Sequence, residues 1–412
     1  MRMKSRALTL TALAVLAGCG GNQQNNSTQG GTNFTSQPAS PRPLNASAEY
    51  LTKGSGVKSI EAGNALGLKL LQAVSVSEGN VLISPLSLAS SLGLAYNGAG
   101  GETRLAIAKA LQLDKIKAQD LNQAAKAIRE ELAVRGEKVD LKIANSLWLK
   151  DGTEFKSDFL KANRSSFSGH TGTAKLGDKT GIAAINKWIS DNTSGEIKNA
   201  VTEPLDTPLM AVNGAFFRGT WKTAFDAEAT RGDKFTPAKG EPVNVPMMSR
   251  AGTHLRLKSE GFEAVRLPYA DGRTSLIVIL PTSDVAAFLK DFGADKWVAI
   301  FDGFKEETGL LSLPKFKAGY ENELSDELTG LGMGGAFGPE ANFSAISAGK
   351  VSLGRMVHKT LIEIGEEGAE QPAKPGEAIE GFNFVANRPF IYAVVDDNTK
   401  AILLIGIFNK PE

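Results

Sequence analysis

Apolar residues recur every three or four positions in the first half of the chain, and this spacing predicts amphipathic helices. The pattern covers residues 59–74, 105–113, 121–134 and 180–192. A further helix is expected to begin at Ser84, where a serine side chain can cap the first turn. Pro85 then occupies the first turn, where its missing N–H does no harm. The first half of the chain is therefore expected to be mostly helical.

Runs of large apolar residues dominate later in the chain and predict strands. They cover residues 143–150, 209–217, 274–280, 310–316, 390–395 and 401–408. The last two runs flank Asp396-Asp397-Asn398-Thr399, a composition typical of a hairpin turn. Helices first and strands later predict an α+β protein with mainly antiparallel sheets.

The N-terminus has the pattern of an export signal. Basic residues Arg2, Lys4 and Arg6 precede an apolar run over 7–17, which is too short for a permanent membrane span. The run ends in Leu16-Ala17-Gly18-Cys19, which resembles a bacterial lipobox. We expect a signal peptide over 1–18, with diacylglycerol carried on Cys19 of the exported protein. The alternative is an ordinary signal peptide with a chance cysteine.

Residues 19–44 are rich in Asn, Gln, Ser, Thr, Gly and Pro. Such a segment buries too little apolar surface to offset the cost of ordering, so we expect a flexible linker. No second linker follows, and residues 45–412 are expected to form a single domain. The protein would then be lipid-anchored at the cell envelope, on its periplasmic or extracellular face.

Composition removes several classes of function. The formal net charge is +1, which gives no electrostatic reason to expect nucleic acid as a partner. Cys19 is the only cysteine, so the exported domain has no intrachain disulfide and no thiolate metal site. We expect no metal and no cofactor.

Catalytic motifs are also missing. The three histidines, His170, His254 and His358, show no metal-ligand spacing, and no Gly-x-Ser-x-Gly elbow is present. A Ser-His-Asp triad is possible in principle because triads are recognised by geometry. A hydrolase remains a minor alternative, and His358 is expected to be a hydrogen-bonded core residue.

A series of short motifs in fixed order resembles the serpin family. The series begins with Asn80-Val81-Leu82-Ile83-Ser84-Pro85-Leu86-Ser87 and continues through Ala144-Asn145-Ser146-Leu147-Trp148. It includes Val212-Asn213-Gly214-Ala215-Phe216-Phe217, Leu313-Pro314-Lys315-Phe316 and Phe384-Val385-Ala386-Asn387-Arg388-Pro389-Phe390. About a dozen such matches span residues 80–408, and their common order makes the resemblance specific.

The resemblance implies a fold and a mechanism. It implies three mainly antiparallel sheets, eight or nine helices, and an exposed reactive-centre loop near the C-terminus. An inhibitory serpin is not an enzyme: a serine or cysteine protease cuts the loop, which inserts into the main sheet and traps the protease as an acyl-enzyme. We expect a monomer whose partner is such a protease.

The resemblance also assigns residues. Ser84, Ser87, Asn213 and His358 match the shutter, a polar cluster beneath the sheet as it opens. Trp221, Lys315 and Glu366 match the breach at the top of the sheet, where Lys315 and Glu366 are expected to form a salt bridge. The reactive-loop hinge corresponds to Glu366, Glu367, Gly368, Ala369 and Glu370.

The segment after this hinge departs from the family, whose hinges are rich in alanine. Pro372 and Pro375 cannot donate to a strand ladder, at a cost on the order of 3 kcal/mol each by analogy with helices. One side-chain alternation turns Gln371 and Pro375 inward, and the other turns Pro372 and Lys374 inward. A non-inhibitory serpin, acting as a binding or structural module, therefore stays open beside an inhibitor.

The scissile bond has two candidate positions because the loop is short: Pro389 follows Gly368 by only 21 positions. Counting forward from the hinge places the bond at Phe382-Asn383, which would suit a chymotrypsin-like protease. Counting back from the motif that ends the loop places it near Ala378-Ile379, which would suit an elastase-like protease if Ala378 were the primary residue.

Overall fold

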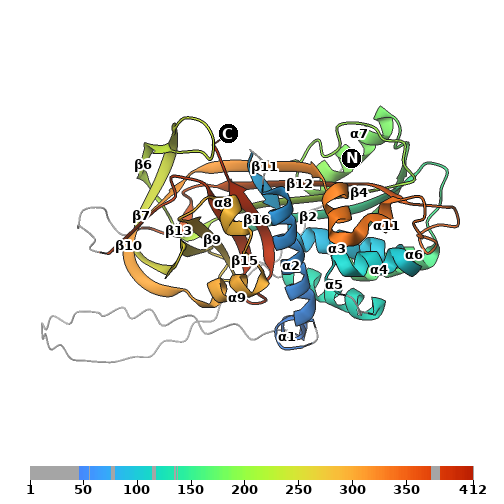
Figure 1. Cartoon of the computed structure of the whole chain (residues 1–412), viewed down its shortest axis with the longest axis horizontal. Coiled ribbons are helices and arrows are strands. Elements are labelled where there is room, and N and C mark those ends of the chain that lie inside the picture. The colour runs from blue at the N-terminus through green and yellow to red at the C-terminus, as the bar shows by residue number, and fades with distance from the viewer. Residues whose placement is uncertain are drawn as a thin grey trace, which may run out of the picture. The chain divides into compact units, whose positions relative to one another are not determined.

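The computed structural model describes residues 46–54, 56–75, 79–113, 117–133, 136, 138–372 and 381–411 (Figure 1). The helices are α1 (Ala46–Thr52), α2 (Val57–Val74), α3 (Pro85–Gly98), α4 (Gly101–Ala110), α5 (Ala118–Ala133), α6 (Ser157–Ser166), α7 (Lys179–Asn192), α8 (Val285–Leu289), α9 (Ala294–Asp302), α10 (Ser325–Leu328), the π-helical turn η1 (Thr329–Met333) and α11 (Gly334–Phe337). The strands are β1 (Val81–Ile83), β2 (Val139–Lys150), β3 (His170–Ala174), β4 (Leu209–Gly219), β5 (Trp221–Thr223), β6 (Asp226–Phe235), β7 (Val243–Ser259), β8 (Phe262–Pro268), β9 (Thr274–Pro281), β10 (Lys305–Pro314), β11 (Phe316–Glu323), β12 (Leu353–Ile364), β13 (Gly368–Glu370), β14 (Phe382–Val385), β15 (Phe390–Asp396) and β16 (Ile402–Phe408).

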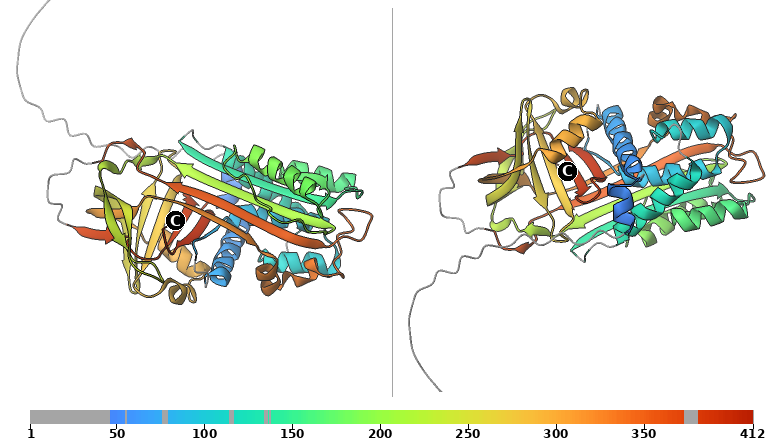
Figure 2. Two further views of the ribbon diagram at one scale, coloured as in Figure 1. Left: turned by 90° about the horizontal axis from the view of Figure 1, so that it is seen from above. Right: turned by 90° about the horizontal axis from the view of Figure 1, so that it is seen from below.

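A five-stranded sheet runs along one side of the domain, in the order β11-β12-β4-β2-β3 (Figure 2). Most of β4 is buried on both faces, and its sequence accordingly lacks the polar alternation of a half-exposed strand. The helix α7 packs against β2 and β3 on one face, and α3 packs against β2 and β4. Because Ser84 caps the start of α3 and Ser87 lies in its first turn, this packing brings two hydroxyl groups beneath the sheet.

The other strands form a nine-stranded sheet and a short two-stranded one. The large sheet has the order β1-β16-β15-β9-β8-β7-β10-β14, with β6 paired to β7. Its centre, β15, β16 and β9, is fully buried and consists almost entirely of apolar residues. The two-stranded sheet pairs β13 with β5.

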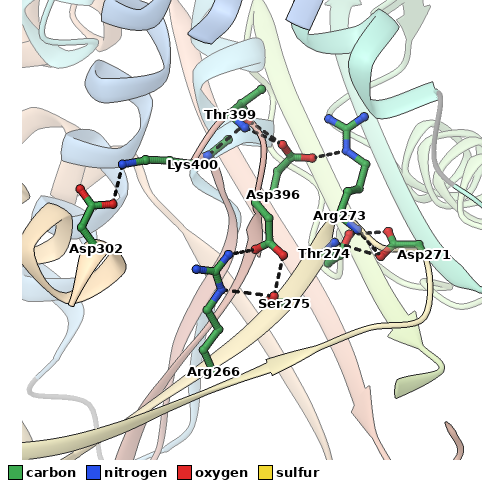
Figure 3. A network of polar contacts seen from close by, with 11 residues as sticks. Arg266, Asp271, Arg273, Thr274, Ser275, Asp302, Asp396, Thr399 and Lys400 are labelled. Atoms are coloured by element: carbon green, nitrogen blue, oxygen red, sulfur yellow. Dashed lines mark hydrogen bonds and ion pairs between the residues drawn. The ribbon is translucent and has the colours of Figure 1, made fainter. Parts of the chain in front are cut away.

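The hairpin predicted around Asp396-Asp397-Asn398-Thr399 is present between β15 and β16 (Figure 3). Asp396 accepts hydrogen bonds from the backbone and side chain of Thr399, both at 2.9 Å. Arg273 reaches Asp396 at 2.7 Å and Glu131 of α5 at 3.1 Å. This buried arginine therefore joins helix α5 to the C-terminal hairpin.

The expected α+β fold with three sheets is confirmed, and two details differ. The described residues contain eleven α-helical segments, whereas the resemblance implied eight or nine helices. Part of the excess arises because residues 325–337 form three short pieces, α10, η1 and α11. Gly332 lies inside η1 with a φ of 95°, which interrupts the regular helix. The predicted strand over 310–316 is wrong as a single element. It ends as β10 at Pro314, and β11 starts at Phe316 in the other sheet.

The predicted order of helices first and strands later is also too simple. Strands β2, β3 and β4 alternate with helices α5, α6 and α7. Residues 44–412 nevertheless form one compact unit, whose described part starts with α1.

Candidate functional site

The five-stranded sheet contains a seam between two parallel strands. Strands β4 and β12 are hydrogen-bonded neighbours, in register from Leu209 beside Leu353 to Arg218 beside Glu363. On its other side, β4 pairs antiparallel with β2, and β12 pairs antiparallel with β11. A strand placed in this β4–β12 seam and running the opposite way would be antiparallel to both sides, which is the better-paired arrangement.

The chain that leaves β12 lies at the end of this seam. After Ile364 it passes Gly365 and forms β13, which pairs in parallel with β5 just beyond the end of β4. The backbone N–H of Trp221 donates to the carbonyl of Glu367 at 2.8 Å, and that of Ala224 donates to the carbonyl of Glu370 at 2.8 Å. The hinge expected at 366–370 is therefore docked beside the seam, outside the five-stranded sheet.

Glycine is required at the start of β13. A Cβ atom on Gly368 would lie 2.2 Å from the backbone nitrogen of Ala224, much closer than any real contact. Ala369 and Glu370, in contrast, are exposed. The Glu-Gly sequence thus lets the hinge lie close against the chain that follows β5.

Trp221 occupies the end of the seam, as the resemblance implied. It is 1% exposed, stacks on Tyr269 with ring centroids 4.3 Å apart, and meets Phe225 edge to face. Its indole N–H donates to the carbonyl of Gly365 at 2.7 Å. The tryptophan therefore holds the backbone at the exact point where β12 gives way to the hinge.

The expected ion pair between Lys315 and Glu366 is formed, at 2.7 Å. Thr230 also donates to the Glu366 carboxylate, at 3.2 Å. Three residues before Glu366, near the end of β12, Glu363 forms ion pairs with Lys317 and Arg218. Half of the Lys315 side chain is exposed, so this pair contributes only about 0–1 kcal/mol and acts mainly to orient the hinge.

A second polar group lies under the seam and is called here the Asn213 cluster: Ser84, Ser87, Asn145, Asn213 and His358. The Asn213 side chain donates to Ser87 Oγ at 2.5 Å and to Asn145 Oδ1. Its own oxygen accepts from the Nδ1 of His358. Because Asn213 lies opposite His358 in the seam register, the cluster bridges β4 and β12 and ties both to α3.

The hydrogen bonds of the cluster fix the state of His358. The backbone N–H of Ser84 donates to His358 Nε2 at 3.1 Å, so Nε2 must be unprotonated and Nδ1 carries the hydrogen. His358 is completely buried, and burial lowers its pKa to about 3. The ring is therefore neutral and acts as a structural link, as its sequence context suggested.

This histidine predicts acid sensitivity. The folded pKa is about 3 and the ordinary value is 6.5, so the unfolded chain binds the extra proton between these values and stability falls as pH drops through 6.5. At pH 5 the loss from this residue is about 2 kcal/mol. Buried His254, whose pKa burial lowers to about 4, acts in the same direction.

Thermal melting of wild type and His358→Gln at pH 7.5 and pH 5 checks this prediction. The variant lacks the titrating ring, so the difference in melting temperature between wild type and variant should be smaller at pH 5 than at pH 7.5. An unchanged gap would show that His358 is not the titrating group.

The structure describes one of the two candidate scissile bonds, Phe382-Asn383. Phe382 and Asn383 belong to β14, which pairs in parallel with Gly309 and Leu310 of β10. The Phe382 ring lies under the guanidinium of Arg256, 4.7 Å from its centroid. Pairing in a strand restrains this bond, so the position counted forward from the hinge is the less favourable of the two for a protease.

Several predicted residues lie outside the described residues. They are Cys19, Lys374, Pro375, Ala378 and Ile379. Gln371 and Pro372 are described, and both follow β13 without belonging to a strand.

Sequence reasoning missed Asn145 as a partner of the Asn213 cluster. Its signal was available: a polar residue inside the apolar run 143–150 has to find a partner when that strand is buried. Thr223 and Ala224, which receive the hinge, gave no such signal because backbone groups make the contacts.

Within the part of the chain that the structure describes, no group of three or more His, Cys, Asp or Glu side chains could hold a metal ion. None of the helices described there is long and apolar enough to cross a membrane.

Comparison with known proteins gives one family. A family model described as serpin (serine protease inhibitor) matches residues 61–411. An uncharacterized serpin-like protein of Thermococcus kodakarensis is 28% identical and covers 100% of both chains, and Serpin B6 of Pongo abelii is 30% identical over 85% of this chain and 99% of its own. The crystal structure of tengpin, a thermophilic serpin in the native state, superimposes with a TM-score of 0.78 at 28% identity and covers 91% of this chain and 97% of that one.

Proposed function

The chain belongs to the serpin family, and from this premise we propose that it is a suicide-substrate inhibitor of serine or cysteine endopeptidases. Members of the family are in general protease inhibitors and not catalysts. The proposed bait is the segment between the hinge and β14, with the scissile bond near Ala378-Ile379.

One observation carries the proposal: β13 and the hinge lie beside the β4–β12 seam, outside it. The seam is closed by direct pairing of two parallel strands, and β13 runs on past β12, paired in parallel with β5 beyond the end of β4. The segment after β13 would have to turn back to reach the seam. If it entered the seam, every new backbone pairing would be antiparallel, and the five-stranded sheet would gain a sixth strand. The gain in pairing and burial would drive insertion.

Inhibition would follow from the competition between this insertion and the protease's own chemistry. The protease nucleophile attacks the scissile carbonyl, the C–N bond breaks, and the new amino end leaves while the loop stays esterified to the enzyme (a thioester for a cysteine protease). Free of its C-terminal tether, the loop enters the seam and carries the protease with it. Inhibition requires that insertion distort the protease active site before water hydrolyses the acyl-enzyme ester.

The two polar groups around the seam would control its opening. Insertion between β4 and β12 must separate Asn213 from His358, so the Asn213 cluster is proposed as the shutter. Trp221 and the Lys315–Glu366 pair hold the hinge at the entrance and are proposed as the breach.

A second function rests on Pro372, two residues after β13. Proline cannot donate to a ladder, and an inserting loop would bring Pro372 into a central strand position, where proline is avoided. A loop that never inserts would leave a non-inhibitory serpin, acting as a binding or structural module.

Incubation of the purified domain with elastase-like and chymotrypsin-like proteases distinguishes the two functions. A covalent complex that survives boiling and a denaturing gel is expected from an inhibitor. Clean cleavage of the loop, with no complex at any ratio of the two proteins, would contradict inhibition and favour the non-inhibitory module.

The double change Pro372→Ala and Pro375→Ala should make inhibition more efficient. Each alanine restores an N–H donor, so insertion becomes faster relative to hydrolysis of the acyl-enzyme. We expect a larger share of covalent complex over cleaved inhibitor on the same gel, and hence fewer inhibitor molecules consumed per protease. Pro204→Ala, in a loop outside the strands, is the matched control. An unchanged share in the double variant would mean that the prolines do not limit insertion.

We also propose that Cys19 anchors the exported protein to the cell envelope. The support is the lipobox-like Leu16-Ala17-Gly18-Cys19 sequence after a short apolar run. A Cys19→Ser variant should move from the membrane fraction to the soluble fraction of the producing cell. A wild-type protein already found in the soluble fraction would contradict the anchor.

A further inference from the structure

Arg250 is a buried arginine without a carboxylate partner among the described residues. The residue is 6% exposed, and its guanidinium lies over the ring of Phe225 at 4.9 Å. A guanidinium has five N–H donors. Hydrogen bonds within the described chain use one of them, from Nη1 to the carbonyl of Thr223, and Nε has no partner.

Two other arginines of the described chain, the buried Arg273 and the partly buried Arg256, show what is missing. Arg273 contacts Asp396 and Glu131, at 2.7 and 3.1 Å. Arg256 contacts Glu307 and Glu263, at 2.7 and 3.0 Å. Each thus has two carboxylates. A buried cation without an anion is costly, and Arg250 is the exception in this group.

Arg250 also lines a cavity of about 420 Å³ next to the hinge. Its walls come from β5, β7, β8 and β10, and Glu370 of β13 contributes to its edge. His254, also 6% exposed, lies in the same wall with its Nε2 atom unpartnered. The cavity therefore combines enough space for a small molecule with buried polar groups that have unused hydrogen-bonding capacity.

The charges around the cavity favour an anion at its floor. Arg266 is neutralised by Asp397 at 2.7 Å, and burial lowers the pKa of His254 to about 4, so that ring is neutral. Two exposed acids, Glu306 and Glu370, lie at the edge of the cavity, and the positive charge of the exposed Lys222 offsets one of their two negative charges. Exposed charges are screened by solvent, whereas the buried Arg250 charge is not.

We propose that this cavity is a binding site for a small oxyanion, a carboxylate or a phosphate, held by the guanidinium of Arg250. A planar guanidinium matches two oxygens of either group, which is why arginine is preferred for such ligands. The site lies next to the hinge but requires neither loop cleavage nor insertion, so it stands independently of the proposed inhibition.

Binding is tested on the intact domain with inorganic phosphate and with acetate, each against sodium chloride at equal ionic strength. We expect one phosphate per chain by equilibrium dialysis, and a melting temperature raised by about 2 °C at tenfold excess over the dissociation constant. If acetate bound more tightly than phosphate, that result would identify the site as one for carboxylates.

Three variants make the test specific to the cavity. Arg250→Met should abolish binding, and Arg250→Lys should weaken it at least tenfold because lysine lacks the two-pronged geometry. Glu370→Gln should tighten binding several-fold by removing a negative charge from the edge. Arg164→Met, which changes an exposed arginine of α6, is the matched control and should bind like wild type.

Two results would overturn the proposal. One is the absence of any phosphate or acetate effect beyond that of chloride. The other is equal binding by wild type and Arg250→Lys, which would show that the two-pronged guanidinium of Arg250 does not hold the anion. Because Arg250→Lys keeps the positive charge, it remains informative if Arg250→Met fails to fold.

Discussion

Replacing Arg273 with methionine should destabilise the domain by about 3–5 kcal/mol, because it leaves the buried carboxylates of Asp396 and Glu131 without their shared cation. Arg273 binds Asp396 at 2.7 Å (Figure 3) and Glu131 at 3.1 Å. The side chains of these two acids are 2% and 4% exposed, so water cannot replace the guanidinium. Helix α5 and the β15–β16 hairpin would lose their polar link.

Urea unfolding measures this loss, with Arg164→Met again as the exposed control. Adding Glu131→Gln to Arg273→Met removes one of the stranded charges and should recover part of the lost stability. A loss below about 1 kcal/mol in Arg273→Met, the level of an exposed pair, would show that the network is not buried in the folded protein.

Asn213→Ala should have the second-largest effect, about 3 kcal/mol of lost stability. Its side chain is the only described one that contacts Ser87, Asn145 and His358 together. Alanine leaves the His358 N–H without a partner in a fully buried place, at about 1–3 kcal/mol. Ser87 and Asn145 keep the hydrogen bond between them, at 3.1 Å, but each loses its bond to Asn213, at about 0.5–1.5 kcal/mol. The loss of the His358 contact destabilises the closed seam in particular, since insertion would separate Asn213 from His358 anyway.

Asn213→Ala should therefore also change the function proposed here. The barrier to seam opening falls, so the variant should lose inhibitory capacity faster than wild type during storage at 37 °C, as uncleaved loops insert spontaneously. Asn199→Ala, at an exposed position, is the control. Equal stability of wild type and Asn213→Ala would contradict the role of the cluster in holding β4 to β12.

The sequence predicted elements best where a local signal and the tertiary environment agree. Helix α3 starts where Ser84 and Pro85 place it, with the Ser84 side chain accepting from the N–H of Ser87. Strands β9, β15 and β16 are buried on both faces, and their continuous apolar runs are unambiguous. The hairpin turn was readable because Asp and Asn favour turns for local hydrogen-bonding reasons.

Prediction failed where chain direction or pairing depends on distant segments. The predicted strand over 310–316 was carried across Pro314, although proline is a poor choice inside a paired strand and marks the change from one sheet to another. Strand β3, His170–Ala174, is short and polar, and only its pairing with β2 makes it a strand. Strand β7 is 17 residues long and carries Arg250, Arg256 and Lys258, so its sequence has little hydrophobic alternation.

The candidate site was recovered mostly through family motifs and only partly through chemistry. The motifs located Ser84, Ser87, Asn213 and His358, and the structure brings them together. No motif could show that Arg250 lacks an anion, because that depends on which carboxylates the fold brings near. The forward count to Phe382-Asn383 likewise did not reveal that these residues begin β14, which pairs with β10.

The central claim is that the β4–β12 seam accepts the segment after β13 as a new strand. Thermal melting of the domain before and after a single cut in the loop tests this most directly. The account predicts that the cut protein, with both fragments still associated, melts far above the intact one, because a full central strand has been added. A melting temperature that stays the same or falls after cleavage would contradict it.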